Sequence, residues 1–291
     1  MYPAYIVHGK EKNLMIDAGI NLYGPLYLKT IETVLSGPDK LDYLFVTHSH
    51  YDHLGAAPYL KRKLPGLKFG GAQKISDLFQ KDSVLARMNK LSDFQRETYK
   101  DIVGNENVVI EPVTLDIPLK EGDKIDLGSM TCEVHETPGH TNDSISFFIP
   151  EQKILFPGEA LGLPNDREKE KPHVIFLSSS DDYIRSIERL KALKSRTICF
   201  GHGWVLTGDD ASDYFSFALD YTVEYIRLIK SYLKRADGNV DEAIKAMAHE
   251  QYDATGAIAQ ERNAYITNLT AQVKHIAGLD HRFGPHQIPK Q

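Results

Sequence analysis

The sequence predicts an α/β protein whose first two thirds alternate short strands with helices and whose last third is helical. Apolar runs typical of buried strands recur between amphipathic helical stretches up to residue 207. After Gly208 the apolar residues keep only helical spacing over 209–278, which indicates two or three helices. We therefore expect a main domain over 1–207 and a C-terminal helical segment over 208–291. Because the apolar stripes of that segment need a surface to bury against, we expect it to cap the main domain.

Each expected element has its own local signal. Apolar or alternating runs bounded by turn residues predict strands at 5–8, 14–18, 41–46, 108–113, 124–127, 131–135, 144–149, 153–156 and 197–200. Helical spacing predicts helices at 25–35, 54–64 and 181–193, and Gly37 and Pro38 end the first of them. Residues 73–102 are polar with a weak apolar stripe, so we expect an exposed helical excursion there.

Composition limits the class of protein and its partners. The chain has 291 residues, and its 42% hydrophobic content excludes disorder as the dominant state. A formal net charge of −6 disfavours nucleic acid as a partner. Cys132 and Cys199 form no disulfide framework, which suggests a reducing, cytoplasmic location, and no apolar run indicates a signal peptide or a membrane span. We expect a small-molecule substrate, neither nucleic acid nor membrane as partner, and leave a homodimer open.

A dense group of metal-type ligands follows the predicted strand 41–46. His48, His50, Asp52 and His53 fall within six residues, in the pattern His-Ser-His-Tyr-Asp-His. Four such side chains on one tight loop cannot all point into an apolar core, but they can converge beyond the end of the strand. Imidazole together with carboxylate suits zinc, iron or manganese better than calcium or magnesium.

This pattern resembles the metallo-β-lactamase superfamily, and four further motifs occur in the order that the family shows. They are Leu14-Met-Ile-Asp17, Thr137-Pro-Gly-His140, Gly158-Glu159 and Gly201-His202. The resemblance covers roughly residues 3–207. It implies a four-layer αββα sandwich as the catalytic domain, with the helical C-terminal segment as a cap.

The resemblance also implies a two-metal site of zinc, iron or manganese. One metal would be held by His48, His50 and His140, and the other by Asp52, His53 and His202. Glu159 and a hydroxide would bridge the two metals, Asp52 would orient the attacking water, and Asp17 would support the ligands from behind. Two divalent cations about 3.5–4 Å apart lower the pKa of a shared water toward neutrality, which creates a nucleophile. The family's bridging residue is Asp, so Glu159 either bridges with its longer side chain or binds one metal only.

A charged loop precedes the predicted helix 181–193. Residues 163–172 contain two prolines and a run of charges, and they form either a solvated loop or a rim that offers cations to an anionic substrate group. Lys171 and His173 are the substrate-binding candidates from this region.

The expected function is that of a two-metal hydrolase acting on an acyl thioester or a related ester. The chain is most similar to glyoxalase II-type and aminobenzoylacetyl-CoA thioesterase-like members of the family. Glu159 argues against lactamase activity, and His50 stands where flavodiiron members carry Glu, which argues against electron transfer. The alternatives are a metal-binding regulatory or interaction protein with little turnover, a phosphodiesterase, a lactonase, and a mononuclear iron persulfide dioxygenase.

Overall fold

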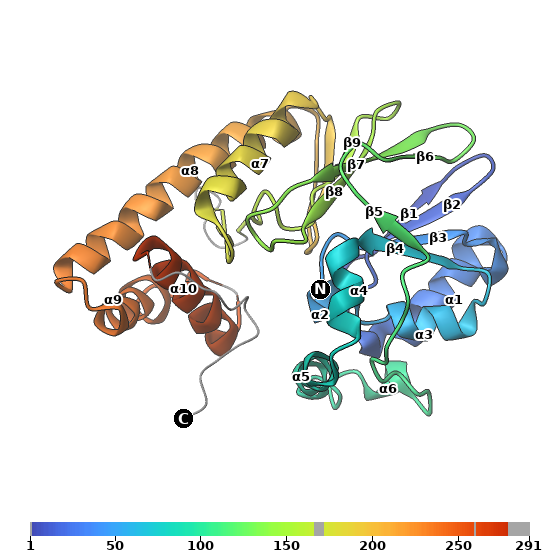
Figure 1. Ribbon diagram of the computed structural model, residues 1–291, viewed down its shortest axis with the longest axis horizontal. Coiled ribbons are helices and arrows are strands. Elements are labelled where there is room, and N and C mark those ends of the chain that lie inside the picture. The colour runs from blue at the N-terminus through green and yellow to red at the C-terminus, as the bar shows by residue number, and fades with distance from the viewer. Residues whose placement is uncertain (1, 166–171, 259, 279–291) are drawn as a thin grey trace. The chain divides into compact units, whose positions relative to one another are not determined.

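The computed structural model describes residues 2–165, 172–258 and 260–278 (Figure 1). The chain divides into two compact units that interleave along the sequence. Unit 1 contains residues up to 136 together with 143–158 and 195–206, and unit 2 contains 137–142, 159–194 and the chain from 207 onward. The expected division at residue 207 stays a prediction.

Unit 1 contains two mixed sheets. The first has the order β1(Tyr5–His8)-β2(Asn13–Ile16)-β3(Tyr43–Phe45)-β4(Lys68–Ala72)-β5(Ile117–Leu119), in which only the β1–β2 pair is antiparallel. The second has the order β11(Val205–Thr207)-β10(Thr197–Cys199)-β9(Ile154–Phe156)-β8(Ile145–Ile149)-β7(Thr131–Glu136)-β6(Lys124–Asp126), in which β9 and β10 are parallel and β6 to β9 antiparallel. Parallel strands end at the same edge of a sheet, so the loops after β2 and β3, and those after β9 and β10, can gather polar residues there.

The two sheets pack face to face through alternate residues of their strands. Leu14 and Ile16 of β2 belong to the core between the sheets, whereas Met15 faces the helices on the other side. Phe45 of the first sheet stacks on Phe147 of the second, with ring centroids 5.8 Å apart. Successive side chains of a strand point to opposite faces. In the central strands one face packs on the second sheet and the other on helices, so these strands are apolar throughout.

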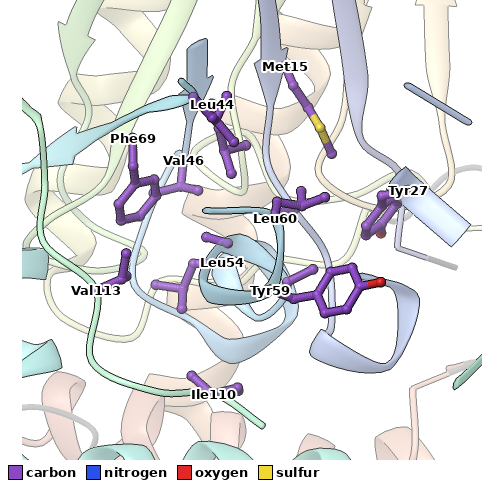
Figure 2. Close-up of a cluster of buried hydrophobic side chains, with 14 of the residues drawn as sticks. Met15, Tyr27, Leu44, Val46, Leu54, Tyr59, Leu60, Phe69, Ile110 and Val113 are labelled. Carbon is purple, nitrogen blue, oxygen red and sulfur yellow. The ribbon is translucent and has the colours of Figure 1, made fainter. Parts of the chain in front are cut away.

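Helices cover the outer face of the first sheet. They are η1(Asn21–Tyr23), α1(Gly24–Leu35), α2(Tyr51–Leu54), α3(Ala57–Lys63), α4(Gln73–Phe79), α5(Asp82–Asp93) and α6(Lys100–Val103), whereas η2(Pro38–Lys40) follows α1 and has no buried residue. Figure 2 shows Leu44 of β3, Val46 directly after it and Phe69 of β4 facing Leu54 and Leu60 from the helices. This core fixes α2 against the end of β3, and α2 carries two of the predicted ligands.

The structure corrects two helix predictions in this unit and adds a strand, β4, that the sequence did not predict. The predicted helix 54–64 is two helices, α2 and α3, that meet at Gly55 and Ala56. The excursion 73–102 is not simply exposed, because Phe79 and Met88 are buried in the core of unit 1. β4 has no strong strand signal, since its sequence KFGGA carries two glycines.

The predicted strand 108–113 is wrong, and β5 is the fifth strand instead. Val108 and Ile110 of the segment 108–113 are buried, as the apolar pattern predicted. The Asn89 side chain, however, accepts a hydrogen bond from the Ile110 N–H and donates one to its carbonyl, both at 2.9 Å. Asn21 likewise donates to the Val108 carbonyl at 2.8 Å. Side-chain amides thus pair backbone groups that a neighbouring strand would otherwise satisfy.

Unit 2 contains the helix that precedes β10 and the helices of the C-terminal segment. They are α7(Ser180–Ala192), α8(Gly208–Arg235), α9(Val240–Met247), the π-helical turn Ala248–Asp253 (η3) and α10(Arg262–Ile276). The expectation of two or three helices in 209–278 is confirmed. Figure 1 shows α7 alongside α8, where Lys191 donates to the Ser216 hydroxyl at 2.9 Å. No helix among the described residues is both long and apolar enough to cross a membrane.

Candidate metal centre

The predicted ligands of unit 1 lie on loops that leave the ends of parallel strands. Thr47 to His50 follow β3, and the short helix α2 then carries Asp52 and His53 in its only turn. His202 lies on the tight connection between β10 and β11. Asp52 and His53 are about 150 positions from His202 in sequence, and all three residues belong to unit 1.

Asp52, His53 and His202 form one compact group, with one ligand atom of each lying within 4.8 Å of the others. His53 Nε2 lies 3.2 Å from His202 Nε2, and Asp52 Oδ2 lies 3.5 Å from the same His202 atom. With metal–nitrogen bonds of ~2.0–2.1 Å, two ligands of one tetrahedral zinc are about 3.3 Å apart. The spacing and the donor types therefore fit a divalent cation.

Asp17 holds His53 from behind. Asp17 Oδ2 lies 2.9 Å from His53 Nδ1, while Oδ1 accepts a hydrogen bond from the Thr47 N–H at 2.8 Å. Asp17 is buried, and its φ of 59° lies in the left-handed region of backbone conformation. With Nδ1 of His53 engaged by a carboxylate, Nε2 carries the lone pair that a cation needs.

Replacing Asp17 by Asn should lower metal affinity about 10- to 100-fold, the usual range for residues that orient a metal-binding histidine. The amide keeps the size of the carboxylate but loses its charge, so it favours the correct His53 tautomer less strongly. Competition with a chelator measures the affinity, and circular dichroism checks the fold.

The matched control for this change is Asp42→Asn. Asp42 is a carboxylate of the same unit that pairs with Lys12 at 2.8 Å. That variant should bind metal as the wild type does. An Asp17→Asn protein with unchanged affinity would show that Asp17 only stabilises the loop.

His48 and His50 form a second pair in unit 1. His48 is buried, and its Nδ1 lies 3.0 Å from the Thr47 hydroxyl. His48 Nε2 lies 3.1 Å from His50 Nδ1, a separation that again fits two nitrogen ligands of one cation. Thr47 thus touches both Asp17 and His48, a role that the sequence analysis did not assign to it.

Two glycines allow the backbone to approach these loops closely. A Cβ on Gly158 would lie 2.8 Å from Thr47 Cβ, and the φ of Gly158 is +57°, which favours glycine. A Cβ on Gly201 would lie 2.7 Å from His53 Cε1. The glycines of the Gly158-Glu159 and Gly201-His202 motifs are therefore required by packing against the ligand loops.

His140 and Glu159 lie in unit 2 and face each other. His140 Nε2 is 2.6 Å from Glu159 Oε2, and both side chains are buried. His140 Nδ1 lies 2.6 Å from the Ile175 carbonyl, so the proton sits on Nδ1 and Nε2 is the ligand-type nitrogen. Along the chain, His140 lies on the connection between β7 and β8, and Glu159 directly follows Gly158 of unit 1.

A model of the metallo-β-lactamase superfamily matches residues 2–202 of the chain. The chain belongs to the metallo-β-lactamase superfamily. Its fold is likewise that of the superfamily, with two mixed sheets and C-terminal helices. A metallo-β-lactamase family protein from Thermus thermophilus superposes with a TM-score of 0.63 at 18% identity, covering 97% of this chain and 91% of that one.

Curated relatives within the superfamily include two named for thioester-cleaving activities. An acyl-coenzyme A thioesterase of Gallus gallus is 27% identical over 66% of this chain and 67% of its own length. A hydroxyacylglutathione hydrolase of Rhizobium meliloti is 27% identical over 62% of this chain, and the match spans 54% of that relative.

The donor set of this superfamily member suits divalent metal binding. Five histidines and two carboxylates from the predicted motifs appear in the groups described above, with ring nitrogens oriented by Asp17, Thr47 and the Ile175 carbonyl. Their assembly into one two-metal site, with Glu159 as the bridge, stays a prediction.

Two tyrosines near the Asp52 group were missed by the sequence analysis. The Tyr2 ring packs edge-on against the His202 ring at 6.0 Å, and its hydroxyl donates to Gln95 at 3.0 Å. Burial raises the pKa of Tyr51, and the neighbouring Asp52 charge raises it further. Tyr51 sits inside the His-rich motif, so its position was a usable signal, whereas nothing in the sequence links Tyr2 to His202.

Of the two predicted substrate-binding residues, the structure describes only His173. Lys171 lies outside the described residues. His173 pairs with Leu163 through backbone hydrogen bonds of 2.7 and 3.1 Å, and it lines a hollow in unit 2. Both assignments stay predictions.

Proposed function

We propose that this protein is a two-metal hydrolase that cleaves an acyl thioester or a related ester. The observation that carries the proposal is the compact Asp52–His53–His202 group, in which the separations fit a metal site. Acyl-coenzyme A thioesterase and hydroxyacylglutathione hydrolase among the relatives support the thioester as the substrate class.

In this proposal the predicted ligands would divide between two cations. His48, His50 and His140 would hold one cation, and Asp52, His53 and His202 would hold the other. Glu159 would offer its carboxylate to both, and that negative charge would offset the repulsion between the two cations. Asp17 and the Ile175 carbonyl keep His53 and His140 in the tautomers that leave Nε2 for the metal.

When bound, two divalent cations would supply a water of lowered pKa and a Lewis acid for the acyl carbonyl. The protein's own contribution is to orient that water and to control access to it. The Asp52 and His202 side chains are each 22% exposed, whereas those of His48 and His53 are nearly fully buried. Asp52 therefore lies at the more exposed side of its group. There its carboxylate can orient the attacking water toward the acyl carbonyl and accept a proton from that water.

A metal count and a substrate panel test the proposal together. Protein purified without added metal should contain two transition-metal ions per chain, and His53→Ala should contain fewer. Acyl-CoA and glutathione thioesters should be hydrolysed faster than lactones or bis-nitrophenyl phosphate. One metal in both proteins would overturn the two-metal assignment, and preference for the phosphodiester would overturn the thioester assignment.

A further inference from the structure

We propose that two tyrosines at the beginning of the first sheet, Tyr2 and Tyr5, position His202 for metal binding. Tyr5 is the first residue of β1, and Tyr2 lies three residues before it. Both side chains contact the turn that carries His202 between β10 and β11, and all of these residues belong to unit 1. The inference rests on the proposed function for the metal, whereas the contacts that carry it are those of the protein alone.

The Asp52–His53–His202 group takes its members from both sheets of unit 1. Asp52 and His53 follow β3 of the first sheet, and His202 follows β10 of the second. The 3.2 Å between His53 Nε2 and His202 Nε2 therefore depends on how the His202 turn is held against the first sheet. Because a metal site needs its ligands held within about 0.5 Å of the binding geometry, a bond between the first sheet and this turn acts on the site.

The Tyr5 side chain makes this connection. Its hydroxyl donates to the Phe200 carbonyl at 2.7 Å and lies 3.4 Å from the Trp204 carbonyl oxygen. Its ring packs on Phe156 of β9, with ring centroids 5.4 Å apart. Burial raises the pKa of Tyr5, so the hydroxyl stays protonated and can donate. A residue from the edge strand of the first sheet thus contacts both ends of the turn 200–204 in the second.

Backbone hydrogen bonds tie the turn 200–204 into one piece. The Phe200 N–H donates to the Trp204 carbonyl at 3.1 Å, which closes the turn at its two ends. The Trp204 N–H donates to the His202 carbonyl at 2.8 Å, which connects the centre of the turn to one of those ends. A bond from Tyr5 to the ends therefore also fixes the place of His202.

Tyr2 packs on the His202 ring itself. The two rings meet edge-on, with centroids 6.0 Å apart. Tyr2 is fixed at two points, because its hydroxyl donates to Gln95 Oε1 at 3.0 Å and its carbonyl accepts from the Tyr27 hydroxyl at 2.6 Å. Gln95 follows α5, and Tyr27 lies in α1, two helices that cover the first sheet. Tyr2 therefore restricts the His202 ring from a place that the layer over the first sheet determines.

Tyr5→Phe tests the inference, because it removes the hydroxyl and keeps the ring that packs on Phe156. In competition between the whole chain and a chelator, the Co²⁺ held by the Asp52 group should bind about 10- to 100-fold more weakly, the range for residues that orient a metal ligand. The visible spectrum of Co²⁺ depends on its ligands, so the absorption of that site should also change. A purely structural role of Tyr5 would lower the unfolding temperature and leave both readouts unchanged.

Trp204 supplies a readout that needs no metal. It is the only tryptophan of the chain, and its N–H donates to the His202 carbonyl. In metal-free protein, loss of the Tyr5 hydrogen bond should let the turn 200–204 move. Acrylamide should therefore quench the Trp204 fluorescence of Tyr5→Phe with a higher quenching constant than that of the wild type.

The matched control is Tyr59→Phe. Tyr59 is a buried tyrosine of α3, on the outer side of the first sheet, and its hydroxyl pairs with Glu106. This variant likewise loses one tyrosine hydroxyl within unit 1. It should retain the Co²⁺ affinity and the Trp204 quenching of the wild type.

Two outcomes would overturn the inference. One is a folded Tyr5→Phe protein with wild-type affinity for every bound Co²⁺. The other, which applies if that variant does not fold, is a Tyr2→Leu protein with unchanged affinity, since leucine removes the ring that packs on His202. A wild type that hydrolyses no thioester, together with a Tyr5→Phe protein that binds Co²⁺ more weakly, would overturn the proposed function and leave this inference standing.

Discussion

Replacing Asp52 by Asn is expected to lower kcat for thioester hydrolysis by about 10²–10⁴-fold, the range for removing a group that takes a proton in the transition state. Asn keeps the shape of Asp52 but can neither accept the proton nor carry the charge. The side chain lies 3.5 Å from His202 Nε2 and is partly exposed, so the effect falls on the site rather than on the core.

Steady-state kinetics with an acyl-CoA substrate measures this loss, and metal analysis of the same protein shows whether a cation is lost with it. Asp93→Asn, which removes an exposed carboxylate that pairs with Arg96, is the control and should leave kcat unchanged. Wild-type turnover in a folded Asp52→Asn protein would remove Asp52 from the mechanism.

Glu159→Gln is expected to weaken binding of the second metal by about 10-fold or more, whereas Glu159→Asp is better tolerated. Gln preserves the length of Glu159 but removes the negative charge that two neighbouring cations would share. Asp keeps the charge and loses about 1.5 Å of reach, one carbon–carbon bond. Gly158, with its positive φ, gives the backbone some freedom to absorb that difference.

Metal per chain and turnover, measured in both variants after equilibration with buffered metal, decide the role of Glu159. His140 Nε2 faces the Glu159 carboxylate at 2.6 Å, so the carboxylate lies within reach of a ligand-type nitrogen. If both variants kept the wild-type metal content and turnover, Glu159 would be a buried partner of His140 and not a metal ligand.

The sequence by itself determined the features that depend on neighbouring residues. The apolar runs of β2 and β3 were enough to predict buried strands, because a strand that is buried on both faces is apolar at successive positions. The run from His48 to His53 predicted a ligand cluster, since side chains this close on one loop share one location whatever the rest of the fold does. The helices of 209–278 followed from their spacing for the same reason.

The tertiary structure decided which distant groups meet. The strand expected at 108–113 has the right burial, yet Asn89 and Asn21 take the place of a neighbouring strand. The Ile175 carbonyl anchors His140 across 35 positions of sequence, and Gln272 reaches Val174 across 98. Such pairings depend on how whole elements pack, and short-range residue patterns carry no information about that packing. The ligand types could therefore be read from the motifs, whereas the groups that orient them, and the hollow of unit 2, emerge only from the fold.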